Sequence, residues 1–137
     1  MNHNNLIKKL TKPKFNRAFV LKPGFRFDAL RFHCNSIVFA TDGLHTDLAR
    51  ISSQLMEAFS DFDLKHDCIV PIGNTYVNML AGYLLRKIVP DSNIVIAIFN
   101  GEERKLYEDP IPEHYVFYEI NPQDLFDPEK FKSLERV

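Results

Sequence analysis

Short apolar runs alternate with helical patterns through the middle of the chain, and this alternation constrains the fold more than any other feature. The runs at 36–40, 68–70 and 93–99 have the continuous hydrophobic character of strands covered on both faces of a sheet. Between them, 46–59 and 74–87 place apolar side chains three and four positions apart, which is the spacing of one helix face. Strand–helix–strand units of this kind predict a mainly parallel sheet with right-handed crossovers.

The segments before this region extend the pattern. The apolar run at 18–21 predicts a first strand. The stretch 25–33 favours a short helix, although its alternating phenylalanines also suit a strand. Residues 1–14 are basic, and Pro13 would end any helix there. We therefore expect a basic N-terminal arm over 1–14.

The segments after this region predict a change in strand direction. The Asn-Gly dipeptide at 100–101 is a strong hairpin signal, with 104–107 as a candidate return strand. Residues 114–120 alternate like an outer or edge strand, and an Asp-Pro pair at 127–128 predicts the start of a short, charged helix. The sequence thus predicts one α/β domain over 15–137. Its expected form is a three-layer, Rossmann-like or flavodoxin-like arrangement with a mainly parallel sheet and an antiparallel hairpin at one edge.

Three details of the two central helices are also predicted. Thr46 is the expected N-cap of the first helix, and Asp47 then lies at the positive end of its dipole. Gly82 interrupts the second helix, which we explain by close packing of Ala81 and Gly82 on the sheet. The core-facing stripe of the second helix is expected to be Val77, Leu80, Leu84 and Ile88.

Bulk properties narrow the class of protein. The length of 137 residues favours one domain, and 45% hydrophobic residues are enough for a packed core. No apolar run approaches the about 20 residues that cross a bilayer, and the first ten residues lack the apolar stretch of a secretory signal. A cytoplasmic location is therefore expected. Cys34 and Cys68 form no zinc pattern and are expected to be buried, reduced thiols.

Charge is unevenly distributed along the chain. The net charge is −1, which argues against a dedicated nucleic-acid binder. Residues 1–35 hold eight basic residues against Asp28, a balance of +7, so the remainder carries −8. A basic arm could dock on an acidic surface, including that of a second copy, and an exposed edge strand at 114–120 would also suit a homodimer.

Four loops are expected to meet at one edge of the sheet. Ligands bind outside the carboxyl ends of parallel strands, and that rule selects the loops at 22–24, 41–43, 73–75 and 100–101. The last joins the others only if its strand is also parallel. No G-x-G-x-x-G fingerprint or P-loop occurs in the chain.

Within these loops, Gly73, Asn74 and Thr75 open a helix, where free backbone N–H groups can hold an anion. Lys22 and Arg26 would add positive charge, and Asp42 would accept a hydroxyl group. The alternative is structural: Gly73 makes a tight turn, and Asn74 only caps the helix. The expected ligand-binding set is Lys22, Arg26, Thr41, Asp42, Gly43, Gly73, Asn74 and Thr75.

Catalytic chemistry has weaker support. Asp42 and His45 are three residues apart and are candidates for an acid–base pair. The alternative is that Asp42 makes a turn hydrogen bond and His45 is solvated. The five histidines are scattered without metal-ligand spacing, so no metal and no cofactor are expected.

These observations favour a small domain that binds an anionic, nucleotide-like or sugar-phosphate-like molecule at the carboxyl ends of its strands. The alternative is a non-catalytic interaction module, an inhibitor or adaptor, that acts through the basic arm and an edge strand. A small enzyme using Asp42 and His45 is a third hypothesis.

Overall fold

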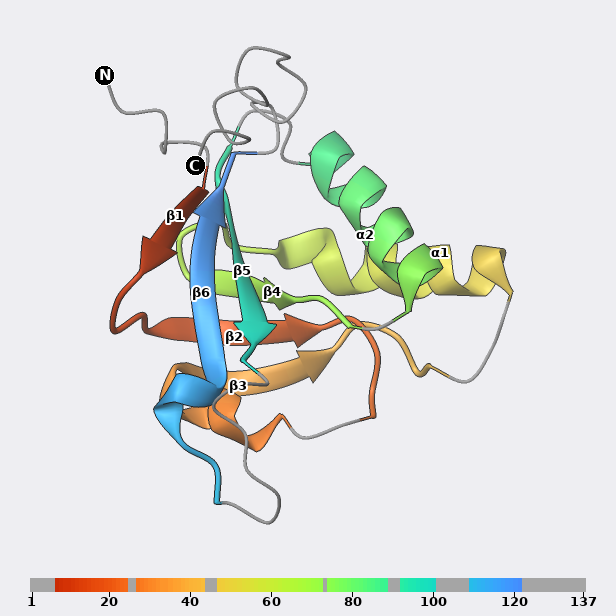
Figure 1. Ribbon diagram of the computed structural model, residues 1–137. Coiled ribbons are helices and arrows are strands. Elements are labelled where there is room, and N and C mark those ends of the chain that lie inside the picture. The colour runs from red at the N-terminus through yellow and green to blue at the C-terminus, as the bar shows by residue number, and fades with distance from the viewer. Residues whose placement is uncertain are drawn as a thin grey trace.

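Six strands form one mixed sheet in the order β1-β6-β5-β4-β2-β3 (Figure 1). β2, β3, β4 and β5 run parallel, β6 is antiparallel to β5, and β1 is antiparallel to β6. The strands are β1 Ile7–Leu10, β2 Phe15–Val20, β3 Cys34–Phe39, β4 Asp67–Val70, β5 Ile94–Phe99 and β6 Tyr115–Ile120. The computed structural model describes residues 7–24, 27–43, 47–72, 74–88, 92–100 and 109–121.

Two α-helices connect the parallel strands of the described region, and short 3-10 turns complete it. The α-helices are α1 Leu48–Ala58 and α2 Thr75–Ile88, and the 3-10 turns are η1 Asp28–Phe32, η2 Phe59–Asp61 and η4 Pro112–His114. The mixed α/β class and the mainly parallel sheet are confirmed. Neither α-helix is long and apolar enough to span a membrane, within the residues that the structure describes.

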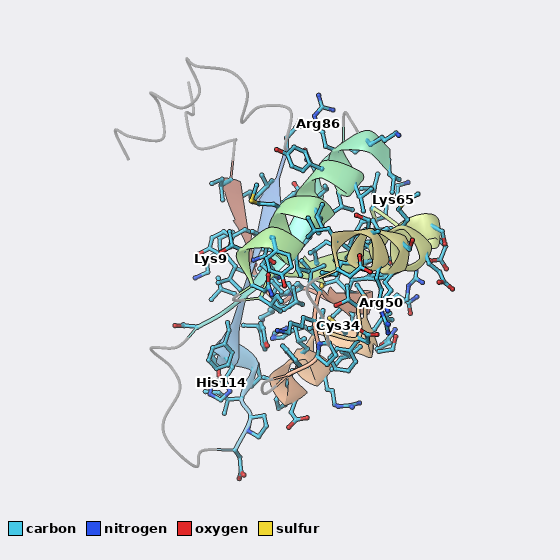
Figure 2. All side chains as sticks on the ribbon, turned by 90° about the vertical axis from the view of Figure 1, so that its right-hand side faces the viewer. Lys9, Cys34, Arg50, Lys65, Arg86 and His114 are labelled. Carbon is cyan, nitrogen blue, oxygen red and sulfur yellow. The ribbon has the colours of Figure 1, made fainter. Side chains whose placement is uncertain are left out.

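Both α-helices lie over the same face of the sheet (Figure 2). Ile51 and Leu55 of α1 and Val77 and Ala81 of α2 pack with Phe19 of β2 in one core cluster. The expected three-layer, Rossmann-like arrangement is therefore not confirmed for the described residues, which place both α-helices on one side.

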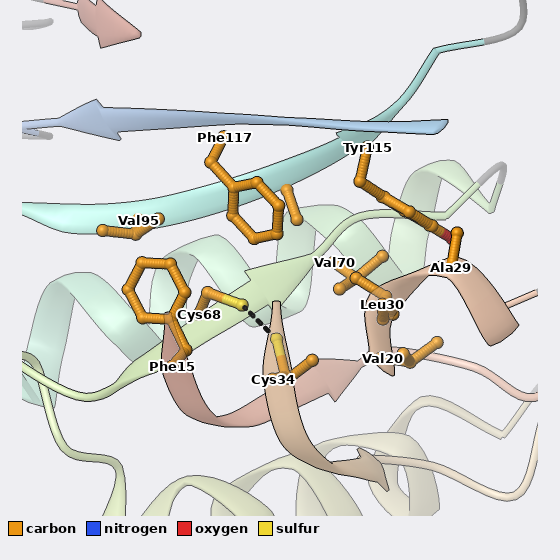
Figure 3. Close-up of a cluster of buried hydrophobic side chains, with 12 residues drawn as sticks. Phe15, Val20, Ala29, Leu30, Cys34, Cys68, Val70, Val95, Tyr115 and Phe117 are labelled. Atoms are coloured by element: carbon orange, nitrogen blue, oxygen red, sulfur yellow. Dashed lines mark hydrogen bonds between the residues drawn. The ribbon is translucent and has the colours of Figure 1, made fainter. Parts of the chain in front are cut away.

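The opposite face is closed by curvature of the sheet and by η1 (Figure 3). Phe15 of β2 stacks on Phe117 of β6 with 5.5 Å between ring centroids. Two strands separate β2 from β6, which would place them roughly 14 Å apart in a flat sheet. The sheet must therefore curl toward this side. His33 fastens η1 to η4, because its Nε2 donates to the carbonyl oxygen of Pro112 at 2.8 Å.

The two sheet edges differ from the expectation. β6 is not an edge strand, because β1 pairs with it from Ile7↔Ile120 to Leu10↔Phe117. Part of the expected basic arm thus contributes the edge strand itself. The other edge is β3. The run at 36–40 is not covered on both faces, because Ser36 is exposed and Phe39 is 48% exposed.

The expected hairpin is only partly visible. β5 and β6 are antiparallel neighbours paired from Ile94↔Ile120 to Phe99↔Tyr115, so β6 is the return strand. The candidate return strand at 104–107 and the helix predicted from 127–128 lie outside the described residues. The prediction of a short helix within 25–33 is confirmed by η1.

The helix details correct two predictions. Asp47, rather than Thr46, caps α1, because its carboxylate accepts the N–H groups of Ala49 and Arg50. Gly82 does not pack on the sheet: it is exposed, and a Cβ there would meet nothing within 4 Å. The buried line of α2 is Val77, Ala81 and Leu85, while Ile88 is exposed and Leu80 and Leu84 are half-buried.

Candidate functional site

The loops expected to carry the site do meet at one edge of the sheet. β2, β3, β4 and β5 are mutually parallel, so their carboxyl ends point the same way. The condition placed on the loop after β5 is met, because β5 pairs in parallel with β4 through Ile69↔Ile96. Topology therefore gathers the loops that begin after Val20, Phe39, Val70 and Phe99.

A cavity of about 590 Å³ lies at this edge. It is enclosed by the loops after β2 and β4, the end of β5 and the beginning of β6. Its volume falls in the range of about 300–1,000 Å³ that is usual for small-molecule sites. The lining residues are Lys22, Pro23, Phe27, Val70, Pro71, Ile72, Asn74, Ile98, Phe99 and Tyr115.

Aromatic side chains supply much of the wall. Phe99 meets Tyr115 edge to face at 5.5 Å between ring centroids, and Phe27 meets Phe39 at 5.8 Å. Burial raises the pKa of Tyr115 from 10.0 to about 12, so this side chain is neutral at physiological pH. Sequence reasoning did not assign these rings to the site, because apolar residues at the ends of strands also suit a core.

Lys22 is the cationic side chain of the cavity. It makes no ion pair with any residue in the described part of the chain, whose ion pairs lie elsewhere. Its stem lies against Gly43, where an added Cβ would come within 2.7 Å of the Lys22 Cγ atom. Gly43 also has a φ of +69°, a conformation that favours glycine. Gly43 therefore leaves room for the Lys22 stem, and its expected contact with a ligand stays a prediction.

Two asparagines hold the loop between β4 and α2. Asn74 caps α2, since its Oδ1 accepts the N–H of Val77 at 3.3 Å. Asn78 donates from Nδ2 to the carbonyl of Ile72 and accepts the Ile72 N–H at Oδ1, at 3.2 Å for the second bond. The capping role expected as the alternative for Asn74 is therefore real. Asn78 was not predicted, although an asparagine in the first turn of a helix is a signal for such a contact.

Thr41 and Asp42 lie apart from this cavity. They line a second hollow of about 550 Å³ beside α1 and β3. Gln54 donates to the Asp42 carboxylate at 3.0 Å, and Arg50 forms an ion pair with it. The buried Thr41 hydroxyl donates to the Leu21 carbonyl at 2.8 Å. Both side chains thus tie loops together, which is a structural use.

The other expected residues divide as follows. Thr75 is the exposed first residue of α2 and does not line the cavity. Arg26, His45 and Gly73 lie outside the described residues. The Asp42–His45 pair therefore stays a prediction, and the described structure brings only Lys22 and Asn74 of the expected set into one cavity.

A charged cluster that sequence reasoning missed lies at the amino ends of β2 and β4. Asp67 is fully buried, and its carboxylate accepts from Arg17 Nη2 at 2.6 Å, from Arg17 Nε at 3.2 Å and from the Asp63 N–H at 2.9 Å. Arg17 also pairs with Asp61 at 3.1 Å and lies over the Phe19 ring. The hydrogen bond to Asp67 raises the pKa of Arg17. Each group here has a partner within the fold.

The two cysteines are buried free thiols with 3.9 Å between sulfur atoms. The hydrogen bond with the Cys34 thiol and burial raise the pKa of Cys68, so it is an uncharged thiol at neutral pH. In the described parts of the chain, no three His, Cys, Asp or Glu side chains gather as a metal site would require.

Comparisons with protein-family models, curated proteins and solved structures gave no match to this chain. The geometry of the cavity therefore carries the functional argument. A cavity with aromatic walls, a cation and a helix beginning can bind a ligand that combines a flat ring with an anionic group.

Proposed function

We propose that this protein binds a small anionic molecule of the nucleotide type in the cavity at the carboxyl ends of β2, β4 and β5. One observation carries the proposal: the cavity joins aromatic and aliphatic walls to a single lysine, Lys22, that has no ion-pair partner among the described residues. Sites of this composition bind ligands with a large apolar surface and a few fixed polar groups.

The walls distinguish two candidate ligand classes. A sugar phosphate has little apolar surface, so it would leave Phe27, Phe99 and Tyr115 in contact with water or with polar groups. A nucleotide places a planar base against the rings, and base–aromatic stacking contributes about 1–3 kcal/mol. The phosphate would then lie near Lys22 and the first turn of α2, which is headed by Asn74. The nucleotide is therefore the favoured class.

A thermal-shift panel tests the proposal. The panel contains adenosine and guanosine monophosphates, ribose 5-phosphate and inorganic phosphate, each up to millimolar concentration. At about 100 times its Kd, a ligand stabilises the folded state by about 2.7 kcal/mol. We expect a rise in melting temperature with a nucleotide, a smaller rise with ribose 5-phosphate and none with phosphate.

Two variants locate the response. Lys22→Ala should abolish the nucleotide-dependent rise without lowering the melting temperature of the free protein. Lys65→Ala removes an exposed lysine near the other end of the sheet and should leave the rise intact. Absence of any rise across the panel at millimolar concentration would refute the proposal.

The edge strand β1 supports a second candidate, a protein-interaction module. β1 comes from the basic segment, and one of its sides pairs with no strand of the described residues. Lys8 and Lys9 discourage pairing with a neutral strand, so a partner would have to be acidic. Lys8→Glu with Lys9→Glu should abolish capture of an acidic extended peptide, and unchanged capture would exclude β1 as the contact.

A further inference from the structure

β3 forms an edge of the sheet that lacks the usual protection. It pairs with β2 on one side and with no strand of the described residues on the other, and Figure 1 shows it at the lower margin of the sheet. Proteins commonly protect an exposed edge with charged residues or proline, because the backbone groups there can pair with another strand. Residues 34–41 contain no charged residue and no proline. The residue types that prevent strand pairing are therefore missing from β3.

The opposite edge, β1, differs from β3 in its charge. Lys8 and Lys9 lie in the middle of β1, and both are exposed. If β1 paired symmetrically with β1 of a second copy, lysines would face lysines, and like charges opposite one another are destabilising. The same symmetric pairing of β3 brings no charges of the strand together. Of the two edges, charge therefore favours β3 for contact with a second copy.

The hydrogen bonds between β3 and β2 determine which backbone groups of β3 point outward. The Ala40 N–H donates to the Val20 carbonyl at 2.8 Å, so Ala40 directs its N–H toward β2. The register of this stretch is regular, with Ala18 opposite Ile37 and Val20 opposite Phe39. Because alternate residues of a strand direct their N–H and carbonyl groups to opposite sides, those of Ile37 and Phe39 point away from β2. These groups can pair with an added strand.

The sequence of β3 is complementary to itself in one antiparallel register. With a twofold axis at Val38, Ile37 lies opposite Phe39 of the second copy, and Phe39 lies opposite its Ile37. These are the residues whose backbone groups point outward, so each pair would exchange both N–H···O=C bonds. Ile37 and Phe27 pack against the same core cluster, and Phe39 contacts the Phe27 ring, so Ile37 and Phe39 lie on one face. A β-branched residue opposite an aromatic one is a favourable cross-strand pair.

Apolar surface at this edge is open to solvent. Phe39 is 48% exposed, and Val38 is of intermediate exposure. Both residues line the hollow of about 550 Å³ beside α1, whose other wall includes Gln54 and Glu57. An added strand would cover Phe39 and Val38, and its side chains would have room on the α1 side of the sheet.

We propose that β3 pairs in antiparallel direction with β3 of a second copy, about a twofold axis at Val38, and so joins the two sheets into one. Symmetric contacts of this kind are the usual form of a homodimer. One strand pair is small compared with a standard interface of about 1,600 Å², so the dimer forms reversibly and at high protein concentration. It does not depend on the ligand proposal, because Ile37, Val38 and Phe39 do not line the 590 Å³ cavity.

Sedimentation velocity of the full chain, from micromolar to millimolar concentration, tests the proposal. We expect the sedimentation coefficient to rise from that of a monomer toward that of a dimer. Phe39→Lys should raise the dimer dissociation constant by about tenfold or more, because it places a charge against an apolar residue. Met79→Lys changes a side chain of similar exposure on α2, 54%, and should leave the constant unchanged. A monomer at every concentration, or equal constants for the wild type and Phe39→Lys, would overturn the proposal.

Cysteine cross-linking tests the register, and it does not depend on a variant that introduces a charge. In the proposed pairing, position 38 faces itself across the axis with about 4.5 Å between Cα atoms, which a disulfide can span. Val38→Cys should therefore form a covalent dimer with oxidised glutathione, while Ile37→Cys faces Phe39 and should not. Both variants keep the buried Cys34 and Cys68, so these thiols cannot account for a difference. Any other pattern of cross-linking would contradict the proposed pairing.

Discussion

At the amino ends of β2 and β4, Arg17, Asp61 and Asp67 satisfy one another, and Asp67 is fully buried. At the carboxyl ends of the same strands, Lys22 and Asn74 line an open cavity instead. Both ends of β2 and β4 carry charge. Among the described residues, Arg17 and Asp67 at the amino ends pair with each other, whereas Lys22 beyond the carboxyl end of β2 makes no ion pair. The comparison indicates that polar groups with internal partners stabilise this fold, and it is the basis for proposing Lys22, which has no ion pair among the described residues, as the cation that binds a ligand.

The asymmetry follows from what each end must do. A buried carboxylate without a cation would carry a large desolvation cost, so Asp67 requires Arg17. Lys22 is only half-buried, and its stem packs on Gly43 while its charged end keeps access to solvent. Stability should therefore respond to changes at the amino end, and ligand affinity to changes at the carboxyl end.

The largest expected effect is that of Asp67→Asn. The substitution keeps the shape of the side chain but leaves Arg17, which is 22% exposed, without its principal partner. Breaking a buried pair costs about 3–5 kcal/mol, and we expect about 3 kcal/mol because Asp61 and water still reach the guanidinium. Chemical denaturation measures the loss, and nucleotide affinity of the folded variant should be unchanged.

Asp61→Asn is the matched control for that variant. Asp61 is 72% exposed, so its ion pair with Arg17 should contribute less than about 1 kcal/mol. Equal losses from Asp61→Asn and Asp67→Asn would show that burial does not distinguish the two carboxylates. A loss of nucleotide affinity in Asp67→Asn would contradict the claim that the amino ends of the strands determine stability and the carboxyl ends determine ligand affinity.

Asn78→Ala should show that the carboxyl end also contains structural groups. The substitution removes both hydrogen bonds to the Ile72 backbone, and we expect a loss of about 1–2 kcal/mol. Because Ile72 lines the cavity, nucleotide affinity should fall as well. Asn35→Ala, at an exposed position of β3, is the control and should change neither quantity. Unchanged affinity in Asn78→Ala would argue that the loop position is irrelevant to binding.

Two glycine substitutions of the same size should have opposite effects. Gly82→Ala adds a methyl group that meets nothing within 4 Å and should stabilise the protein by up to about 1 kcal/mol. Gly43→Ala forces a residue with φ +69° against Lys22 and should destabilise by about 1 kcal/mol or more. Only Gly43→Ala should weaken nucleotide binding. Equal effects of Gly43→Ala and Gly82→Ala on nucleotide binding would contradict the proposal that Lys22 contacts the ligand.

The smallest expected effect is that of Tyr115 on the free energy of unfolding, and it appears only in alkaline solution. The pKa of Tyr115 is raised by burial from 10.0 to about 12. The unfolded chain therefore loses this proton at lower pH than the folded chain does, so the stabilising contribution is complete below pH 10 and is lost between about pH 10 and 12. Tyr115→Phe should make the fall in stability over this interval shallower. An identical pH profile would show that Tyr115 titrates normally.

Local patterns predicted the central elements well, because their apolar runs and helical spacing are properties of neighbouring residues. The identity of the edges could not be predicted in this way. Ile7 pairs with Ile120 across most of the chain, and nothing near either residue signals the pairing. The same is true of Asp67, because its partner Arg17 lies 50 residues away in the sequence.

The residues of the candidate site also divide into those that could be predicted from the sequence and those that could not. Lys22 and Asn74 were predicted from the rule for carboxyl ends of parallel strands, and both line the cavity. Phe27, Phe99 and Tyr115 were missed, because their spacing is that of core residues. Asp42 was predicted to contact a ligand, and this role stays a prediction. The structure shows its carboxylate bound by Arg50 and Gln54, which lie four residues apart on one helix face and could have suggested this contact.

The most direct test of the account is a nuclear magnetic resonance titration of the uniformly ¹⁵N-labelled protein with adenosine monophosphate. The account predicts that amide signals of Leu21, Lys22, Val70, residues 72–74 and residues 98–100 shift progressively, while those of residues 15–17 and 61–67 stay in place. Lys22→Ala should remove the shifts. Shifts that gather on β1 or at the amino ends, or no shifts up to millimolar nucleotide, would contradict a nucleotide site at the carboxyl ends of the strands.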